Sequence, residues 1–305
     1  MNRFTTVRID VHQHLWPRPF LDALRARRTP PRLDGWELHL PGQRPYRVDP
    51  AHHDVDARAE QADADGDTLV CVSPSAVLGL DRLPRAASDE LAAAWLESAL
   101  ALPAPFRAYA MAITPGALEQ ALAAGAIGLE LGADLLAAPR GLERLAPLLA
   151  VLDAAERPLL VHPGPTDRQD TAHRPAWWAP VVPYVAQLNA AWWTWVEGGR
   201  ERFPRLPVCF VALGGLAPLH GERQRARGGA AGSVDALTFV ETSTYGTVAV
   251  DAVVRVLGID VVCHGSDRPY AVPALPRLGS DAALNAISSL NPGRLLAHVP
   301  QEVNA

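Results

Sequence analysis

The sequence contains no lysine, so arginine supplies all 28 of its basic side chains. This absence excludes Schiff-base catalysis and metal bridges built on a carbamylated lysine. The chain has no excess of positive charge, because 33 acidic residues outnumber the 28 arginines and leave a net charge of −5. No basic footprint for nucleic acid is visible. We therefore expect a small-molecule substrate as the partner and no nucleic acid.

Cysteine and long apolar runs are equally scarce. The three cysteines, Cys71, Cys209 and Cys263, lie in separate short apolar runs without close spacing, which predicts buried thiols rather than disulfides. No run is long enough to span a bilayer. The first residues contain Arg3 and Arg8 but no long apolar stretch of the kind found in a secretory signal. These features predict a cytoplasmic protein with no membrane partner.

The sequence does contain a regular alternation of short β-branched runs with longer helical patterns, which is typical of repeated βα units around a parallel sheet. The predicted strands are Val7–Val11, Thr68–Val72, Arg107–Ala112, Ile127–Leu131, Pro158–His162, Pro207–Ala212, Leu237–Glu241 and Ile259–His264. The predicted helices are Val55–Ala64, Asp89–Ala101, Gly116–Ala124, Leu142–Ala155, Val181–Arg202, Pro218–Arg227, Val248–Leu257 and Asp281–Leu290. Eight such units in a chain of this length predict a single (β/α)8 TIM barrel spanning residues 1–305.

The first predicted strand ends in the pair His12 and His14. Side chains two residues apart in a strand point the same way, so both imidazoles could bind one ion. The same alternation predicts that Asp10 lies on that face, deeper in the barrel. A His-x-His pair alone fits a metal site and two partly exposed polar residues equally well.

Two later strand ends favour the metal site. His162 ends the fifth run and Asp267 follows the eighth. Because the carboxyl ends of barrel strands meet at one face, His12, His14, His162 and Asp267 are expected to converge there. Three imidazoles and a carboxylate around one divalent ion, with a position left for water, are typical of hydrolytic sites. Asp267 is then either the fourth ligand or the group that accepts a proton from metal-bound water.

These motifs together resemble the amidohydrolase superfamily. The segments that carry the resemblance are Asp10–His14, Leu160–Pro163, Gly265–Pro269, Gly214–Gly215 and Asn291–Leu296. The most similar branch includes aminocarboxymuconate-semialdehyde decarboxylase and related aromatic-acid decarboxylases. The resemblance implies a (β/α)8 barrel, usually with zinc, bound by His12, His14, His162 and Asp267.

The sixth predicted strand departs from the pattern of that family. The family commonly has a histidine there, just before a leucine and two glycines, whereas this chain has Ala212. A methyl group cannot transfer a proton. Either Asp267 performs the acid–base chemistry alone, or another histidine such as His220 or His173 supplies it, or the chain has lost the chemistry of the family.

Further site candidates lie near the predicted strand ends. Glu130 ends the fourth run and is expected to orient a histidine ligand or contact substrate, and Glu241 occupies a similar place on the seventh strand with a weaker case. Trp16 is a further candidate for substrate binding. The lysine-free chain favours a single metal ion over a bridged pair.

Arginines near the site mouth could receive a substrate carboxylate through paired donors. Arg18 and Arg168 are candidates, but only Arg268 directly follows an expected metal ligand, so we expect it to bind substrate. The tryptophans Trp192, Trp193 and Trp195 are expected to pack in the core or at an interface, which leaves a homodimer open.

Three functional interpretations follow. The first is a metal-dependent hydrolase with one divalent ion, expected to be zinc, that acts on a small carbonyl or carboxylate-bearing substrate through metal-activated water. The second is non-oxidative decarboxylation of an aromatic or unsaturated carboxylic acid. The third is a barrel that binds a ligand but is catalytically impaired, which Ala212 favours.

Overall fold

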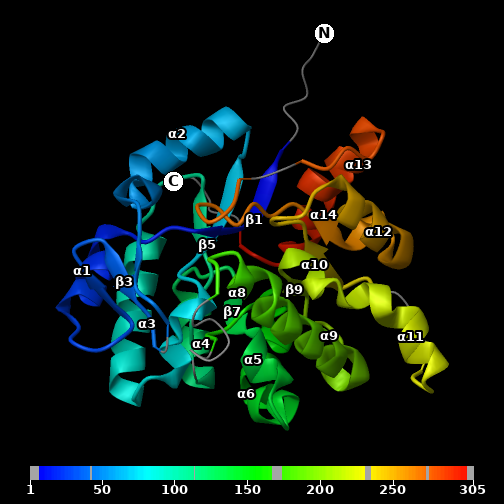
Figure 1. Cartoon of the computed structure of the whole chain (residues 1–305), viewed down its shortest axis with the longest axis horizontal. Helices are drawn as coiled ribbons and strands as arrows, with labels where there is room; N and C mark the ends of the chain where they lie inside the picture. The colour runs from blue at the N-terminus through cyan, green and yellow to red at the C-terminus, as the bar shows by residue number, and fades with distance from the viewer. Residues whose placement is uncertain are drawn as a thin grey trace.

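A computed structural model describes residues 7–41, 43–112, 114–166, 174–230, 235–272 and 275–300. Arg168 and His173 lie outside these residues. Eight parallel strands surround a common axis, with helices outside them (Figure 1). The strands are β1 (Ile9–His14), β5 (Leu69–Ser73), β6 (Phe106–Ala108), β7 (Leu129–Gly132), β8 (Leu159–His162), β9 (Val208–Phe210), β10 (Thr238–Glu241) and β11 (Val262–Cys263). Each of the eight predicted strands overlaps one of them.

Main-chain hydrogen bonds close these strands into a barrel. The strands form two parallel sheets, in the orders β1-β5-β6 and β11-β10-β9-β8-β7. At one junction Ala110 N donates to Gly128 O at 2.9 Å and Glu130 N donates to Ala110 O at 2.9 Å. At the other junction Val11 N donates to His264 O at 3.0 Å. The predicted (β/α)8 barrel is therefore confirmed.

The outer layer consists of helices that alternate with the strands. They are α1 (Arg18–Ala26), α2 (Val55–Asp65), α3 (Arg85–Leu100), α4 (Pro115–Ala123), α5 (Ala133–Ala137), α6 (Gly141–Ala155), α8 (Trp178–Val181), α9 (Pro183–Arg202), α10 (Ala212–Gly215), α11 (Gly221–Ala226), α12 (Thr247–Leu257), α13 (Asp281–Asn285) and α14 (Asn291–Leu295). Short 3-10 turns are η1 (Pro50–His53), η2 (Ala76–Leu78), η3 (Leu80–Arg82), η4 (Ala217–His220) and η5 (Ile259–Val261), and η6 (Ala286–Leu290) is a π-helical turn. Within the described residues, no helix has the length and apolar character needed to cross a membrane.

Three of the predicted helices are interrupted. The segment predicted as Pro218–Arg227 is divided between the 3-10 turn η4 and the helix α11. The segment predicted as Val181–Arg202 is divided into α8 and α9 at Pro183, whose ring has no N–H to donate and which opens α9. The segment predicted as Asp281–Leu290 continues from α13 into the wider turn η6. The uninterrupted helix α6 has its leucines on one buried side, as the spacing of three and four residues predicts.

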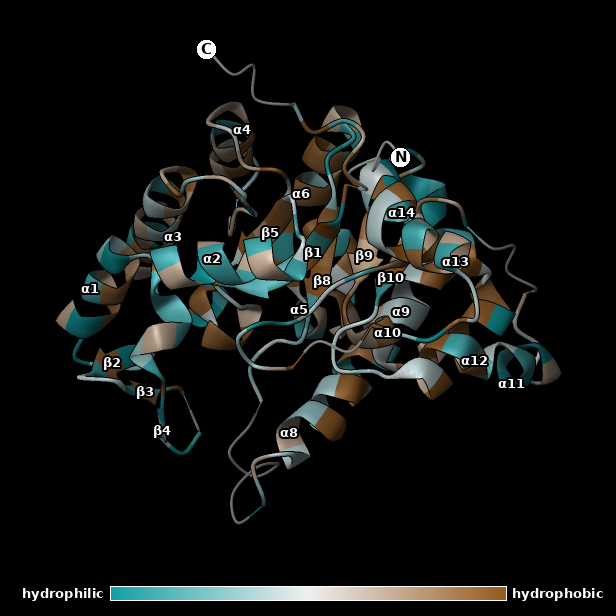
Figure 2. Cartoon of the chain, turned by 90° about the horizontal axis from the view of Figure 1, so that it is seen from above, coloured by the Kyte–Doolittle hydropathy of each residue, from teal (hydrophilic) through white to brown (hydrophobic). Residues whose placement is uncertain are grey.

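The long connection after β1 contains a small antiparallel sheet. Its strands are β2 (Arg32–Asp34), β3 (Glu37–His39) and β4 (Tyr46–Arg47), and they lie to one side of the barrel in Figures 1 and 2. Leu33 and Leu38 pair across β2 and β3 and are fully buried with α1 and α3. This packing fixes the connection beside the carboxyl end of the barrel, where Tyr46 lines a cavity.

The barrel interior is apolar and contains the cysteines. Cys71, Cys209 and Cys263 are buried, belong to the main hydrophobic cluster and are free thiols. Burial raises the pKa of each thiol, that of Cys71 above its ordinary value and those of the other two well above it. The prediction of buried, unpaired thiols is therefore confirmed.

Candidate metal centre

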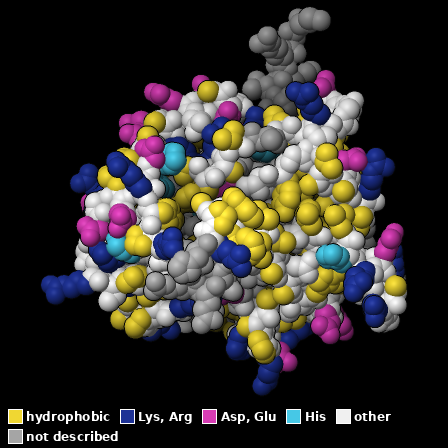
Figure 3. All heavy atoms as spheres, viewed as in Figure 1, with side chains coloured by type: hydrophobic (Ala, Val, Ile, Leu, Met, Phe, Trp, Pro, Cys, Tyr) yellow, Lys and Arg dark blue, Asp and Glu magenta, His cyan; other side chains and the backbone are white. Residues whose placement is uncertain are grey.

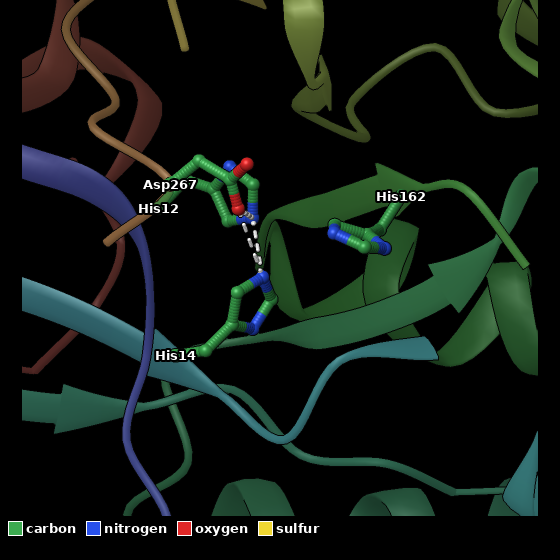
Figure 4. A group of neighbouring side chains, drawn as sticks. All are labelled: His12, His14, His162 and Asp267. Atoms are coloured by element: carbon green, nitrogen blue, oxygen red, sulfur yellow. Dashed lines mark hydrogen bonds and ion pairs between the residues drawn. The ribbon is translucent and has the colours of Figure 1, made fainter. Parts of the chain in front are cut away.

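Four predicted ligands meet at the carboxyl end of the barrel (Figure 4). β1 supplies His12 and His14, β8 supplies His162, and the segment after β11 supplies Asp267. His12 Nε2 lies 3.1 Å from His14 Nε2, and His14 Nε2 lies 3.3 Å from Asp267 Oδ1. One ligand atom from each residue lies within 4.8 Å of the others. The structure thus brings together all four predicted metal-ligating groups.

Each imidazole has an acceptor behind it that fixes its orientation. His12 Nδ1 lies 3.3 Å from Glu241 Oε1, and His14 Nδ1 lies 3.2 Å from the main-chain oxygen of Ser73. His162 Nδ1 lies 2.9 Å from Pro163 O. An acceptor at Nδ1 places the proton there and leaves the lone pair of Nε2 for a metal ion, as is usual for metal-bound histidines.

The spacing of the donors also suits a metal ion. Ligands about 2.0–2.1 Å from a tetrahedral ion lie roughly 3.3 Å from one another. The separations of 3.1 and 3.3 Å around His14 are of this size, and Asp267 Oδ1 lies 3.8 Å from His12 Nε2. The residues present therefore fit a divalent ion. A set of imidazole and carboxylate donors serves zinc and manganese alike.

Burial controls the protonation of the site. Burial lowers the pKa of His14 and of His162 well below the ordinary value, and neighbouring histidines lower it further. Burial also lowers the pKa of His12, but the hydrogen bond to Glu241 and the charges of Glu241 and Asp267 raise it more, to about 9. Two imidazoles are thus neutral and ready to bind a metal, while the third must lose a proton first.

A β-bulge in β1 overturns one prediction. Strict alternation places Asp10 on the same face as His14, but the register of β1 against β5 shifts between Asp10 and Gln13. Asp10 pairs with Val70 whereas His14 pairs with Ser73, so the two side chains lie on opposite faces. The prediction that Asp10 faces the ligands is wrong, because the bulge reverses the alternation of the strand.

The four predicted ligands line a cavity of about 610 Å³. Trp16 lines this cavity, stacks on His53 at 4.4 Å between ring centroids and donates from Nε1 to Pro74 O at 2.9 Å. Its place is compatible with the predicted contact to substrate. The rest of the lining includes an apolar wall, a set of phenols and the arginines Arg44 and Arg174. The wall residues are Val185, Leu188, Val211 and Ala212, and the phenols are Tyr46, Tyr184 and Tyr270.

The other two predicted substrate-binding residues lie elsewhere. Glu130 is buried, accepts a hydrogen bond from Ser73 Oγ at 3.1 Å and lines a separate cavity of about 190 Å³. Burial raises its pKa to about 7. Arg268 donates from Nη2 to Asp65 Oδ2 at 2.7 Å and does not line the large cavity. Contact of either residue with substrate stays a prediction.

The place of the missing histidine is occupied by a left-handed turn. From Ala212 to Leu216 the φ values are 49°, 51°, 61°, 60° and 59°. Non-glycine residues adopt this conformation at a cost of about 1–2 kcal/mol each. A side chain at Gly215 would lie 2.7 Å from Val185 O, so the turn packs directly against α9. The N–H of Ala212 donates to Glu241 Oε1 at 2.6 Å, which connects the turn to His12.

No other histidine fills this position among the residues that the structure describes. His12, His14 and His162 are the only histidines that line the described part of the cavity. His220 is exposed and does not line it. The hypothesis that His220 supplies the missing imidazole therefore receives no support from the geometry, and His173 lies outside the described residues.

Backbone strain is concentrated around the cavity. Ser75, Ala212, Thr244 and Asp267 all have positive φ, between 49° and 84°, and all four line it. They follow the ends of β5, β9, β10 and β11. A left-handed conformation is particularly unfavourable for a β-branched residue such as Thr244. Such strain persists where the surrounding structure enforces it, and it is commonly found at functional sites.

Some residues of the site are only weakly indicated by the sequence. Glu241 has a weaker case than Glu130 from the sequence, yet its Oε1 lies 3.3 Å from His12 Nδ1. Tyr46 and Tyr184 come from distant segments, so spacing along the chain could not reveal them. Tyr270 follows Asp267 by three residues, and its N–H donates to Asp267 O at 2.8 Å, a turn that a local reading of Gly265–Pro269 could have extended to include it.

Fold and site together define a (β/α)8 barrel with a cluster of three histidines and one aspartate suited to a divalent ion. No protein-family model and no curated protein sequence matches the chain. Solved structures share the fold, and one of them is described as an amidohydrolase II, 18% identical to this chain over 95% of its length, with a TM-score of 0.68.

Three of these structures illustrate the likeness. The 5-carboxyvanillate decarboxylase of Sphingomonas paucimobilis is 17% identical over 96% of this chain and 99% of its own, with a TM-score of 0.72. A 5-carboxyvanillate decarboxylase of Novosphingobium aromaticivorans, complexed with manganese and 4-hydroxy-3-methoxy-5-nitrobenzoic acid, is 16% identical over 95% and 96%, with a TM-score of 0.70. The 4-oxalomesaconate hydratase of Rhodopseudomonas palustris is 18% identical over 96% and 96%, with a TM-score of 0.68. At these identities the likeness shows the fold.

Proposed function

We propose that this protein is a metal-dependent enzyme of the amidohydrolase type that decarboxylates a small carboxylic acid without oxidation. The observation that carries the proposal is the convergence of His12, His14, His162 and Asp267 on the lining of a cavity large enough for a substituted benzoic acid. Two of the solved structures described above are decarboxylases. This support reverses the order of the sequence-based interpretations, in which hydrolysis came before decarboxylation.

The ion would supply positive charge that holds the substrate carboxylate and an adjacent oxygen. Asp267 is the group placed to move a proton, because its side chain is 20% exposed on the cavity lining and burial raises the pKa of its carboxyl. Protonation of the carbon that bears the carboxylate allows the carbon–carbon bond to break. Carbon dioxide leaves, the bonding electrons return to the substrate, and Asp267 regains its proton from water.

The cavity walls suit a flat substrate with oxygen substituents. Trp16 and Tyr270 both line the cavity, and the ring of Tyr270 lies 5.4 Å from that of His14 between centroids. Phenol and indole rings offer large contact areas together with polar groups that can donate hydrogen bonds. At Ala212 a methyl group replaces an imidazole, which leaves room for an apolar substituent against Val185 and Leu188.

The proposed site needs a metal ion and a small-molecule partner. We propose one divalent ion, with zinc the prediction from the motifs and manganese the ion present in a structure of the same fold. We also propose that residues 1–305 form one domain, that the partner is a small molecule, and that neither nucleic acid nor a membrane is bound. For a homodimer, the exposed residues Trp177, which directly precedes α8, and Val181 of α8 are better candidates than Trp192 and Trp195, which are buried within the chain.

The candidate dimer interface near α8 has exposed apolar side chains. Figure 3 shows hydrophobic side chains gathered near the middle of the face on which α8 lies in Figure 1. Trp177 is 58% exposed and Val181 is 57% exposed. Arg174 lies over the ring of Trp178 at 4.2 Å from the ring centroid, so one of the adjacent tryptophans already has a partner.

A substrate screen tests the proposed reaction. Protein stripped of metal and reconstituted with one equivalent of manganese or zinc is incubated with a panel of hydroxybenzoic acids and, separately, with lactones and amides. The proposal expects metal-dependent release of carbon dioxide from at least one acid. Hydrolysis of a lactone or amide without release of carbon dioxide from any acid would instead establish the hydrolase interpretation.

A further inference from the structure

A buried carboxylate lies behind the ligand-bearing part of β1 and contacts neither the cavity nor any ligand side chain. Asp10 is fully buried, and its Oδ1 accepts hydrogen bonds from His12 N and from Ser266 N, both at 3.1 Å. His12 is a ligand, and Ser266 immediately precedes the ligand Asp267. One oxygen atom thus joins the two segments that carry three of the four ligands.

The contact of Asp10 Oδ1 with the His12 N–H accounts for the bulge in β1. A carboxylate that accepts from the N–H two residues later forms an Asx turn, which replaces regular strand pairing. The register shift of β1 begins at Asp10 and is complete at Gln13. Below the bulge Asp10 faces away from the cavity, and above it His14 faces the cavity. The contact from Asp10 therefore sets which side chains of the strand point at the metal.

The other oxygen of Asp10 belongs to a directional chain of hydrogen bonds. Oδ2 accepts from Gln13 Nε2 at 2.8 Å, and Gln13 Oε1 accepts from Nη2 of Arg58. Arg58, buried on α2, donates from Nη1 to His14 O at 2.9 Å and to His52 O at 2.8 Å. Only one orientation of the Gln13 amide satisfies both neighbours, because one is an acceptor and the other a donor.

We propose that Asp10 is the positioning residue of the metal centre, which fixes His12, His14 and Asp267 in their ligating arrangement through Gln13, Arg58 and the Ser266 N–H. It acts on the ligands through the main chain and not by contact with the ion. The inference rests on the proposed function only in requiring that a divalent ion binds. Its consequence is that metal affinity depends on a residue whose side chain lies on the opposite face of β1.

The substitution Asp10→Asn tests the series of hydrogen bonds from Asp10 through Gln13 to Arg58, because it replaces one acceptor with a donor. The introduced amide nitrogen would face Gln13 Nε2, and a flipped Gln13 amide would instead turn its nitrogen toward Arg58. Adding Gln13→Glu to Asp10→Asn restores an acceptor for both neighbours and keeps the net charge unchanged. Asp235→Asn is the matched control, because Asp235 also accepts from an N–H two residues later, that of Leu237 at 2.9 Å, but lies at the opposite end of a strand, before β10.

Manganese and zinc dissociation constants, measured by competition with a fluorescent chelator, give a readout that is independent of activity. We expect Asp10→Asn to raise the dissociation constant about 10- to 100-fold, as loss of groups that orient metal ligands typically does. The double variant should return to within about threefold of the native value, and Asp235→Asn should change the melting temperature but not the metal affinity.

Two results would overturn the proposal. One is an Asp10→Asn variant that is folded and binds metal as tightly as the native chain. The other is a double variant that binds no better than Asp10→Asn, or that does not fold, and this second result decides the matter even if Asp10→Asn alone is unfolded. A native chain that binds metal but releases no carbon dioxide would contradict the proposed function and leave the role of Asp10 open to the same measurement.

Discussion

His12 and His14 enter the candidate metal centre from β1, at the junction where the barrel closes, whereas His162 enters from β8, which is paired on both sides within a sheet of five strands. At the junction a buried polar network of Asp10, Gln13 and Arg58 holds the ligands. On β8 the strand neighbours are apolar, and His162 is oriented by the main-chain oxygen of the next residue. The barrel therefore positions its predicted ligands in two ways. A buried side-chain network holds those of β1 at the junction, whereas regular strand pairing holds His162 on β8.

Removing one ligand from each side should give the largest effect. We expect His12→Ala and His162→Ala each to weaken metal binding by on the order of a hundredfold or more, because each removes one of four protein ligands. Isothermal titration with manganese or zinc measures the loss. His220→Ala, which alters an exposed histidine outside the described cavity lining, is the control and should bind as the native chain does.

The carboxylates of Glu241 and Glu130 allow β1 and β8 to be compared further. Glu241 contacts His12 Nδ1 at 3.3 Å, whereas Glu130 lies 3.8 Å from His162 Nδ1. We therefore expect Glu241→Gln to raise the metal dissociation constant about 10- to 100-fold and Glu130→Gln to raise it less. Equal effects measured by chelator competition would mean that the two sides depend on their carboxylates alike.

A substitution at Ala212 tests the role of the apolar cavity wall that follows β9. We expect Ala212→His to raise KM for substrates with apolar substituents, because the imidazole would occupy the space beside Val185 and Leu188, while kcat changes less than about tenfold. Steady-state kinetics on substrates with and without such a substituent measure both values. Turnover that appears only in the variant would show that the native chain is catalytically impaired, which is the third interpretation of the sequence.

The last prediction concerns stability in acid, at a residue that is not a predicted metal ligand. Burial lowers the pKa of His53 to about 3, and its Nδ1 accepts from Trp16 N at 3.0 Å. His53 is protonated below about pH 6.5 in the unfolded chain, but only below about pH 3 in the folded chain. Its contribution therefore lowers the free energy of unfolding as the pH falls from about 6.5 toward 3, by up to about 1.4 kcal/mol per pH unit.

The variant His53→Asn keeps an acceptor near Trp16 N but cannot be protonated in this range. Urea unfolding at pH 7 and pH 5 should show a smaller loss of stability in acid for His53→Asn than for the native chain. An equal loss in both would mean that His53 is not the group responsible.

The predictable part of the molecule was the part that follows local periodicity. Alternating runs predicted the eight strands, and the position of His162 and Asp267 at strand ends predicted their convergence with His12. Apolar spacing in α6 predicted its buried side. These features depend on short stretches of chain whose geometry is common to every parallel barrel.

The rest depends on contacts between distant segments. The carboxylate of Asp10, where the register of β1 shifts, also accepts from the Ser266 N–H, 256 residues away, and alternation within β1 alone could not predict that contact. Arg268 bonds Asp65 on α2, a partner that only the folded chain supplies, and its contact with substrate stays a prediction. Tyr46 reaches the cavity because a small sheet packs beside the barrel, and no periodicity in that connection indicates it.

Release of labelled carbon dioxide tests the central claim most directly. A panel of hydroxybenzoic acids with a 13C-labelled carboxylate is incubated with metal-free protein and with protein reconstituted with one equivalent of manganese or zinc, and the products are followed by NMR. The account predicts labelled carbon dioxide or bicarbonate from at least one acid, only in the reconstituted sample, and none with His12→Ala. Failure of the native chain to bind a divalent ion, or release of carbon dioxide at the same rate without one, would contradict it.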